Sequence, residues 1–197
     1  MAMDIHIGNI CSNACKGPYN IRQLRKFISS EATKVLVHAF VMLHLDYCNS
    51  LLSGVPQYQL NHLQKILNAA ARLVCLVPKF DHLTLYLIDL PWLPVEFQIK
   101  FKVLIFVFKA LNGMAPRYIS DLIRKKSSPW SALWSNDLTL LVMSWTKCKT
   151  LGNWAFAYAG PSMWNKLPKP IQMVPNIYSF KKQLKTYLFR EACNIQW

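Results

Sequence analysis

The chain has 197 residues, of which 53% are apolar and 16% charged. This composition excludes a disordered chain, is sparse in charge for a self-sufficient soluble domain, and suits one well-cored domain or two small ones. The formal net charge is +14, and it is unevenly distributed: up to Gln98 there are 8 basic and 6 acidic residues, and from Ile99 onward 15 basic and 3 acidic. The segment from Ile99 onward therefore has a net charge of +12, which predicts a polyanionic partner, either nucleic acid or an anionic membrane surface. The simpler alternative is a basic face that only keeps the chain soluble.

Membrane insertion and secretion are not expected. The richest apolar run, Phe101 to Leu111, contains Lys102 and Lys109 and reaches only half of the roughly 20 residues that a membrane span needs. The first residues, "MAMDIHIGNIC", lack the basic and apolar parts of a secretory signal. Six cysteines, at positions 11, 15, 48, 75, 148 and 193, show no zinc-finger spacing and are interpreted as free thiols. We therefore expect an intracellular protein, in the nucleus or cytoplasm.

In chain order, residues 1–19 are predicted to be a loose lead-in, followed by a short basic helix at 21–30 and a long helix at 31–52. The inward face of that long helix is predicted from an apolar stripe: Leu36, Phe40, Leu43, Tyr47 and Leu51. Long helices at 57–77 and 94–111 follow, with short ones at 83–88 and after Pro116. The segment "NAAAR" (68–72) offers small residues where another helix could approach closely.

The pattern changes after Lys126. Residues 127–178 are predicted to be irregular and rich in Pro and Trp, with at most one short β-hairpin around 138–150 and one helical turn near 160–176. A basic helix at 179–193 is predicted to close the chain, with Phe180, Leu184, Tyr187 and Leu188 inward. The fold class is mainly α, divided into the lead-in 1–19, a helical domain 20–126, the irregular segment 127–178 and the C-terminal basic helix 179–197.

The stretch "LHLDYCNSLLSGVP" (43–56) gathers reactive side chains, and a helix would bring His44 and Cys48 together. A Cys–His pair or a two-ligand metal site is geometrically allowed, but a thiol beside an apolar stripe is more often a small buried hydrophobe. The nine acids are isolated from one another and there is no glycine-rich phosphate loop. We therefore expect no enzyme activity, no cofactor, no metal and no small-molecule substrate.

Cations alternate with aromatic residues in the second part, as in Trp164-Asn165-Lys166 and Phe180-Lys181-Lys182. Cations could neutralise phosphates while aromatic rings stack on bases, or the aromatic residues could be core and only the cations exposed. The predicted nucleic-acid-binding residues form three clusters: Lys181, Lys182, Lys185 and Arg190; Arg124, Lys125 and Lys126; and Arg22, Arg25 and Lys26.

Five blocks in order carry a resemblance: "EATKVLVHAFVMLHLDYCNSLLSGVP", "LQKILNAAARLVC", "FDHLTLYLIDLPWLPVEFQIKFKVLIFVFKALNGMAPRYISDLI", "AFAYAGPSMWNKLP" and "LKTYLFREAC". Over about residues 10–193 the chain resembles the thumb and post-thumb region of the reverse transcriptase of vertebrate non-LTR (LINE-type) retrotransposons. The resemblance implies a helical, thumb-like bundle of three long helices that grips an RNA or RNA–DNA duplex through its backbone. The family's catalytic palm, its paired aspartates and its endonuclease have no counterpart here.

The chain departs from the family pattern at Trp134, Trp145 and Trp154, where arginine is usual, at Ser144 (proline) and at Asn153 (aspartate). The arginine-to-tryptophan changes would remove phosphate-binding cations, and they suggest a decaying genomic copy. The sequence thus predicts a non-catalytic retrotransposon-derived fragment with nonspecific affinity for RNA or RNA–DNA duplex. The alternative is an orphan polypeptide whose exposed apolar helix faces bind protein or an anionic membrane.

Overall fold

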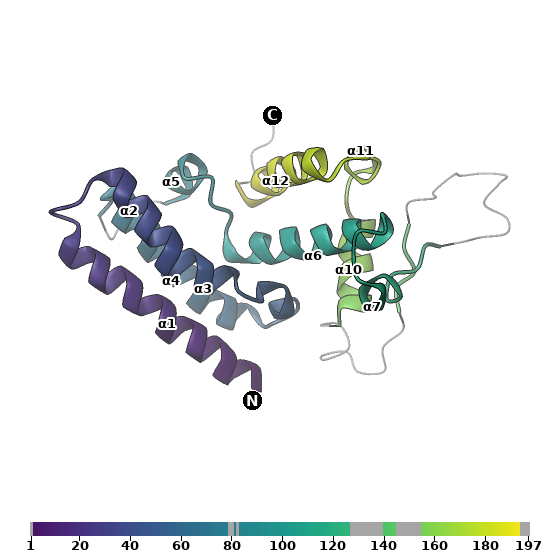
Figure 1. The fold of residues 1–197 in the computed structure, drawn as a ribbon, viewed down its shortest axis with the longest axis horizontal. Coiled ribbons are helices and arrows are strands. Elements are labelled where there is room, and N and C mark those ends of the chain that lie inside the picture. Colours follow the sequence, from purple (N-terminus) through teal and green to yellow (C-terminus); the bar gives the residue numbers. More distant parts are fainter. Residues whose placement is uncertain (1, 79–80, 82, 127–139, 145–154, 194–197) are drawn as a thin grey trace. The chain divides into compact units, whose positions relative to one another are not determined.

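The computed structural model describes residues 2–78, 81, 83–126, 140–144 and 155–193 (Figure 1). Over these residues the fold is mainly α, as predicted, and the one β pairing is an isolated antiparallel bridge between Lys125 and Leu141. The helices are α1 (Ala2–Leu24), α2 (Ser30–Val37), the π-helical turn η1 (His38–Met42), α3 (Leu43–Asp46), the 3₁₀ turn η2 (Asn49–Leu52), α4 (Gln57–Cys75), α5 (Thr84–Asp89), α6 (Val95–Leu111), α7 (Arg117–Ser120), α10 (Phe156–Asn165), α11 (Lys169–Gln172) and α12 (Ile177–Cys193).

The chain divides into two compact units. Unit 1 contains residues 1–49, 55–98 and 192–197, and unit 2 contains residues 50–54 and 99–191. This division falls inside the predicted 20–126 domain, because the apolar residues of α6 beyond Gln98 pack with elements that come much later in the chain. None of the helices in the described part is long and apolar enough to cross a bilayer.

Unit 1 begins with α1, so the prediction of a loose lead-in over residues 1–19 is wrong. Gly8, Gly17 and Pro18 obscure a helical pattern in this segment. The residues that α1 buries are spaced by three or four positions: Ile7, Ile10, Ala14, Gly17 and Ile21. That spacing places them on one face of the helix, and packing of this face offsets the cost of a proline inside the helix.

Gly17 is required by a close approach between α1 and η1. A Cβ atom at position 17 would lie 3.1 Å from Cβ of Phe40 and 3.2 Å from its carbonyl oxygen. Both distances are shorter than an ordinary van der Waals contact, so a larger residue here would push α1 away from η1.

The predicted long helix at 31–52 ends earlier than expected. Ser29 caps its start, where its Oγ accepts a hydrogen bond from Ala32 N. The helix stops at Asp46, because Tyr47 is extended and Cys48 has a φ of 53°. Asn49 is buried at this end and its Nδ2 donates a hydrogen bond to Asp46 Oδ1 over 3.1 Å.

The predicted inward stripe of this helix is also wrong. Phe40 is 53% exposed and Tyr47 68% exposed, and Leu43 and Leu51 are exposed as well. The buried face consists of Thr33, Val37, Val41 and Leu45. Both faces have a helical spacing of three or four residues and nearly all positions from 35 to 45 are apolar, so periodicity alone does not select the buried face.

Helix α4 matches its predicted range and supplies the centre of unit 1. Leu67, Ala70 and Ala71 are fully buried, which confirms that the "NAAAR" segment faces other helices. Helix α5 packs there: Leu83 and Leu87 cluster with Ala71, and Trp92 covers them. Val95 N, at the start of α6, donates a hydrogen bond to Gln64 Oε1 over 2.8 Å.

Unit 2 is built around an aromatic cluster on α6, α10 and α12. The rings of Phe108 and Phe180 stack with centroids 4.3 Å apart, and the Trp164 ring lies 5.9 Å from that of Phe180. Gly160 on α10 allows a close contact, since a Cβ there would lie 2.9 Å from Cγ2 of Val107. Helices α10 and α11 therefore correct the prediction that residues 127–178 are irregular.

The described part of the 138–150 segment pairs with residues 124–126 but forms no hairpin there. Lys126 N donates to Leu140 O and Val142 N donates to Arg124 O, each over 2.9 Å. Asn165 fixes the same segment from α10, since its amide both donates to and accepts from the backbone of Leu141.

Replacement of Phe180 by Ala tests the aromatic cluster. Because Phe180 is fully buried between Phe108 and Trp164, Phe180→Ala should lower the free energy of unfolding by about 3–5 kcal/mol. Urea unfolding followed by near-UV circular dichroism measures the loss. The matched control, Tyr178→Ala, removes an exposed ring from the same helix and should change stability by less than about 0.5 kcal/mol. Equal effects of the two variants would contradict this packing.

Candidate nucleic-acid interface

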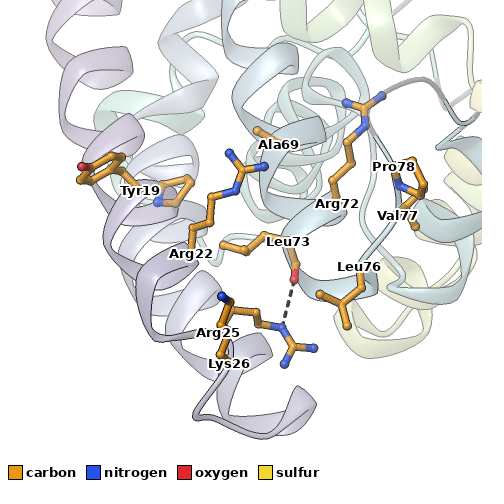
Figure 2. Close-up of a pocket in the computed structure, with 11 residues that line it drawn as sticks. Tyr19, Arg22, Arg25, Lys26, Ala69, Arg72, Leu73, Leu76, Val77 and Pro78 are labelled. Carbon is orange, nitrogen blue, oxygen red and sulfur yellow. Dashed lines mark hydrogen bonds between the residues drawn. The ribbon is translucent and has the colours of Figure 1, made fainter.

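A groove of about 790 Å³ lies in unit 1 between the last turns of α1 and α4 (Figure 2). Four cations line it, three from the predicted cluster on and after α1 and one from α4: Arg22, Arg25, Lys26 and Arg72. The remaining lining is one aromatic ring and apolar residues: Pro18, Tyr19, Ala69, Leu73, Leu76, Val77 and Pro78. None of the described residues that line the groove is acidic.

The groove exists because α1 and α4 run parallel. Near their starts, Gln59 Nε2 donates a hydrogen bond to Asp4 Oδ1, and near their ends Arg25 Nε donates to Leu73 O over 3.3 Å. The C-terminal ends of the two helices therefore meet. Each end carries unpaired carbonyl groups and a partial negative charge, which favours cations there by about 0.3–1 kcal/mol each.

The chain turns away sharply at the end of α4. Helix α4 ends at Leu76, whose φ of 57° is left-handed, and Val77 N donates back to Arg72 O over 3.2 Å. This is the geometry of a common helix C-cap, and Pro78 prevents the helix from continuing. Leu76 is 67% exposed as a result, and it lies at the edge of the groove.

Arg25 has a structural role in this arrangement. In addition to Leu73 O, its guanidinium binds Ile28 O through Nη1 over 3.1 Å (Figure 2 shows the first of these bonds). It thus satisfies one carbonyl at the end of α4 and one after α1, and it fixes the turn between α1 and α2 against α4.

Arg72 is the residue that the sequence-based prediction missed. Its Nε is buried and has no hydrogen-bond acceptor among the described residues. No carboxylate of the described chain forms an ion pair with Arg72, Arg22 or Lys26, so their charges are not neutralised within it. The sequence pattern holds no signal that would bring Arg72 to the cluster after α1, because only the packing of α1 against α4 places them at one groove.

The α12 cluster lies on the outer side of a core helix in unit 2, as predicted. Phe180, Leu184 and Leu188 are buried, while Lys182 and Arg190 are exposed and Lys181 and Lys185 half-buried. Lys185 Nζ lies 5.9 Å from the centre of the Phe189 ring, a cation–π contact within the helix.

The third predicted cluster, Arg124, Lys125 and Lys126, is exposed along the bridge to residues 140–142. It lies on a different element of unit 2 from the α12 cluster, and no described pocket is lined by members of both. Trp164 and Phe180 are core, so at these positions the prediction of aromatic rings available for bases is wrong and the alternative holds. Trp134, Trp145, Cys148, Asn153 and Trp154 lie outside the described residues.

His44 and Cys48 do not lie on one helix, so the helical spacing on which the predicted Cys–His pair depended is absent. Cys48 lies beyond the end of α3 in a left-handed conformation, and both residues are exposed, so the prediction of a buried thiol is wrong. No cluster of three His, Cys, Asp or Glu side chains suited to a metal occurs among the described residues. Within the same part of the chain, Cys11, Cys15, Cys48, Cys75 and Cys193 form no disulfide.

Comparison of the chain with models of protein families, with curated proteins and with solved structures finds no match. The resemblance to a retrotransposon reverse transcriptase therefore stays a prediction from the sequence. The groove itself is defined by geometry and charge alone, whichever protein the chain derives from.

Replacement of Arg25 by Met tests its structural role. The variant leaves Leu73 O and Ile28 O without their donor, so we expect a loss of about 1–3 kcal/mol in the free energy of unfolding. Arg22→Met removes the same charge from an exposed position and should cost less than about 0.5 kcal/mol. Chemical denaturation measures both. An Arg22 variant as unstable as the Arg25 variant would mean that charge, and not hydrogen bonding, stabilises this end of the helices.

Alkylation kinetics test the thiols. Burial, and then the neighbouring Cys15, raise the pKa of Cys11; burial, and then the Asp89 carboxylate, raise the pKa of Cys75. With iodoacetamide at mildly alkaline pH, Cys11 and Cys75 should react more slowly than the exposed Cys15 and Cys48, as peptide mass spectrometry would show. Modification of Cys48 much faster than Cys15 would contradict the absence of an activated Cys–His pair.

Proposed function

We propose that this chain is a non-catalytic, retrotransposon-derived segment of a reverse transcriptase polyprotein that binds RNA or RNA–DNA duplex without sequence selectivity. The observation that carries the proposal is the groove of unit 1, where four cations meet and no carboxylate lines the surface. Arg22 and Lys26 are exposed there, and exposed cations neutralise phosphates, which gives affinity without base readout. The proposed location is inside the cell, in the nucleus or cytoplasm, where such partners occur.

Unit 2 supports the same function through its charge. From Ile99 onward the chain holds 15 basic and 3 acidic residues, and several of these cations lie on exposed surface: Arg124, Lys125, Lys126, Lys182 and Arg190. A helix such as α12, with a buried apolar side and cations on its outer side, can follow a phosphate backbone. The resemblance to a thumb region supports this interpretation of the helix.

A second candidate function is binding to protein or to an anionic membrane. The specific observation in its favour is the apolar surface along α2, η1 and α3, where Val35, Phe40, Leu43 and Tyr47 are all more than half exposed. Exposed apolar patches of this kind mark surfaces that bind a partner or cause aggregation.

Salt dependence of binding tests the proposed function. About four phosphate contacts should weaken binding on the order of 100-fold between ~50 mM and ~200 mM salt, measured by fluorescence anisotropy with an RNA–DNA duplex. The double variant Lys182→Gln/Arg190→Gln should lower the slope of log affinity against log salt by about 2, since each phosphate contact contributes about 1.

The matched control for this titration is Lys16→Gln/Lys65→Gln, which removes two exposed cations that lie outside the three clusters. It should leave the slope unchanged. Affinity that does not respond to salt, or no binding at ~50 mM salt, would refute the proposed function. Binding to anionic liposomes without binding to nucleic acid would favour the second candidate.

A further inference from the structure

The groove between α1 and α4 is apolar as well as cationic, and a duplex does not explain both features. A duplex keeps its bases stacked inside and presents phosphates and sugars, for which exposed cations suffice. Here the cations border a surface formed by Leu73, Leu76 and Val77, and the Leu76 side chain remains 67% exposed. A ligand that covers this surface must itself have an apolar face.

Tyr19 adds an aromatic ring to the edge of the groove. Its side chain is 68% exposed and lies on α1 one turn before Arg22 (Figure 2). Figure 2 shows the two side chains leaving α1 in different directions, the Arg22 guanidinium toward α4 and the Tyr19 ring away from it, so a strand that contacts both must pass over this edge of α1. An exposed tyrosine beside an arginine is the pairing that stacks on a base while it binds the adjoining phosphate.

The cations lie on both sides of the apolar surface. Figure 2 shows Arg22 extending from α1 toward Ala69 on α4, while the Arg72 guanidinium lies near Val77 and Pro78. Arg25 is occupied by the carbonyls of Leu73 and Ile28, which leaves Arg22, Lys26 and Arg72 for a ligand. An extended strand that crosses the groove would meet a cation on each side of the apolar surface.

The size of the groove fits an unpaired nucleotide. Its volume of about 790 Å³ is within the range of roughly 300–1,000 Å³ that is typical of sites for small organic ligands. A base and its sugar occupy such a space, whereas a duplex remains outside it and contacts only the rim. Charge complementarity supports a polyanion, because the lining holds four cations and no acid.

We infer that the groove of unit 1 binds single-stranded nucleic acid, with one base over Tyr19, another against the Leu73–Val77 surface, and phosphates on Arg22, Lys26 and Arg72. The inference rests on the proposed function and refines it, because it assigns unpaired nucleotides to unit 1 and leaves duplex contacts to the cations of unit 2. An acidic peptide would share the charge requirement, but it does not require the aromatic ring.

The experiment uses the full chain and fluorescence anisotropy with labelled oligouridylate, oligothymidylate and an RNA–DNA duplex of equal length. Tyr19→Ala should weaken binding of both single strands about ten-fold, the effect of one lost base stack, and should leave duplex binding within two-fold. Tyr19→Phe should restore single-strand binding, because it keeps the ring. Arg72→Gln should weaken single-strand binding and lower its salt slope by about 1.

Two control variants match these changes. Tyr58→Ala removes an exposed tyrosine from the opposite end of α4, and Lys16→Gln removes an exposed cation of α1 outside the groove. Both should bind oligouridylate as the unaltered chain does. Thermal unfolding of every variant establishes that it is folded, and the exposed position of Tyr19 predicts no loss of stability there.

The outcomes separate the inference from the function on which it rests. Two results would overturn the inference: Tyr19→Ala has no effect on single-strand binding, or it weakens duplex binding as much as single-strand binding. In either case, duplex binding that weakens with salt would still support the proposed function. Failure to bind any of the three nucleic acids would refute both. A third outcome would assign the groove to an acidic peptide instead. In that outcome polyglutamate displaces oligouridylate and binds more tightly than the oligonucleotide, and the Tyr19→Ala variant binds polyglutamate as well as the unaltered chain does.

Discussion

The parallel packing of α1 and α4 is the constraint on which the candidate site depends. Two helices that run parallel place their C-terminal carbonyl groups at the same end, and the partial negative charges there repel each other. Cations relieve this repulsion, and Arg25 does so directly through Leu73 O and Ile28 O. Arg22, Lys26 and Arg72 lie at the same end, and none of them forms an ion pair with a carboxylate of the described residues.

The same packing explains the apolar part of the groove. Helix α1 packs along α4, and Arg25 holds the two helix ends together. Past that contact the chain must leave α4 in a left-handed turn at Leu76, which exposes a leucine that no neighbouring helix covers. Cations and apolar surface therefore occur together for one geometrical reason, and a ligand with both a charge and a flat apolar face is complementary to them.

The sequence predicted helices well where one face of the pattern was distinct, as in α4, α6 and α12. It failed in α1, because glycine and proline conceal an apolar face that only contact with α4 and η1 makes visible. The prediction of the buried face failed in α2 and α3 for the opposite reason. These helices have two apolar faces with the same helical spacing, and which of them is buried depends on where α1 packs. Arg22, Arg25 and Lys26 were identifiable as neighbours in sequence, but Arg72 joins them from 46 residues beyond Lys26, through a packing that periodicity does not specify.

The stretch from His44 to Asn49 shows how reactive side chains can gather for structural reasons. Asp46 and Asn49 are held to each other across the end of α3, and the left-handed Cys48 allows the chain to reverse there. A residue with positive φ is uncommon outside glycine and is often a sign of a functional site. Here the reversal lies next to the exposed surface formed by Phe40, Leu43 and Tyr47. The described residues hold no group of three His, Cys, Asp or Glu side chains that could bind a metal, at this reversal or elsewhere. The candidate binding site of unit 1 is therefore not this stretch but the groove at the C-terminal ends of α1 and α4, where Arg22, Lys26 and Arg72 gather.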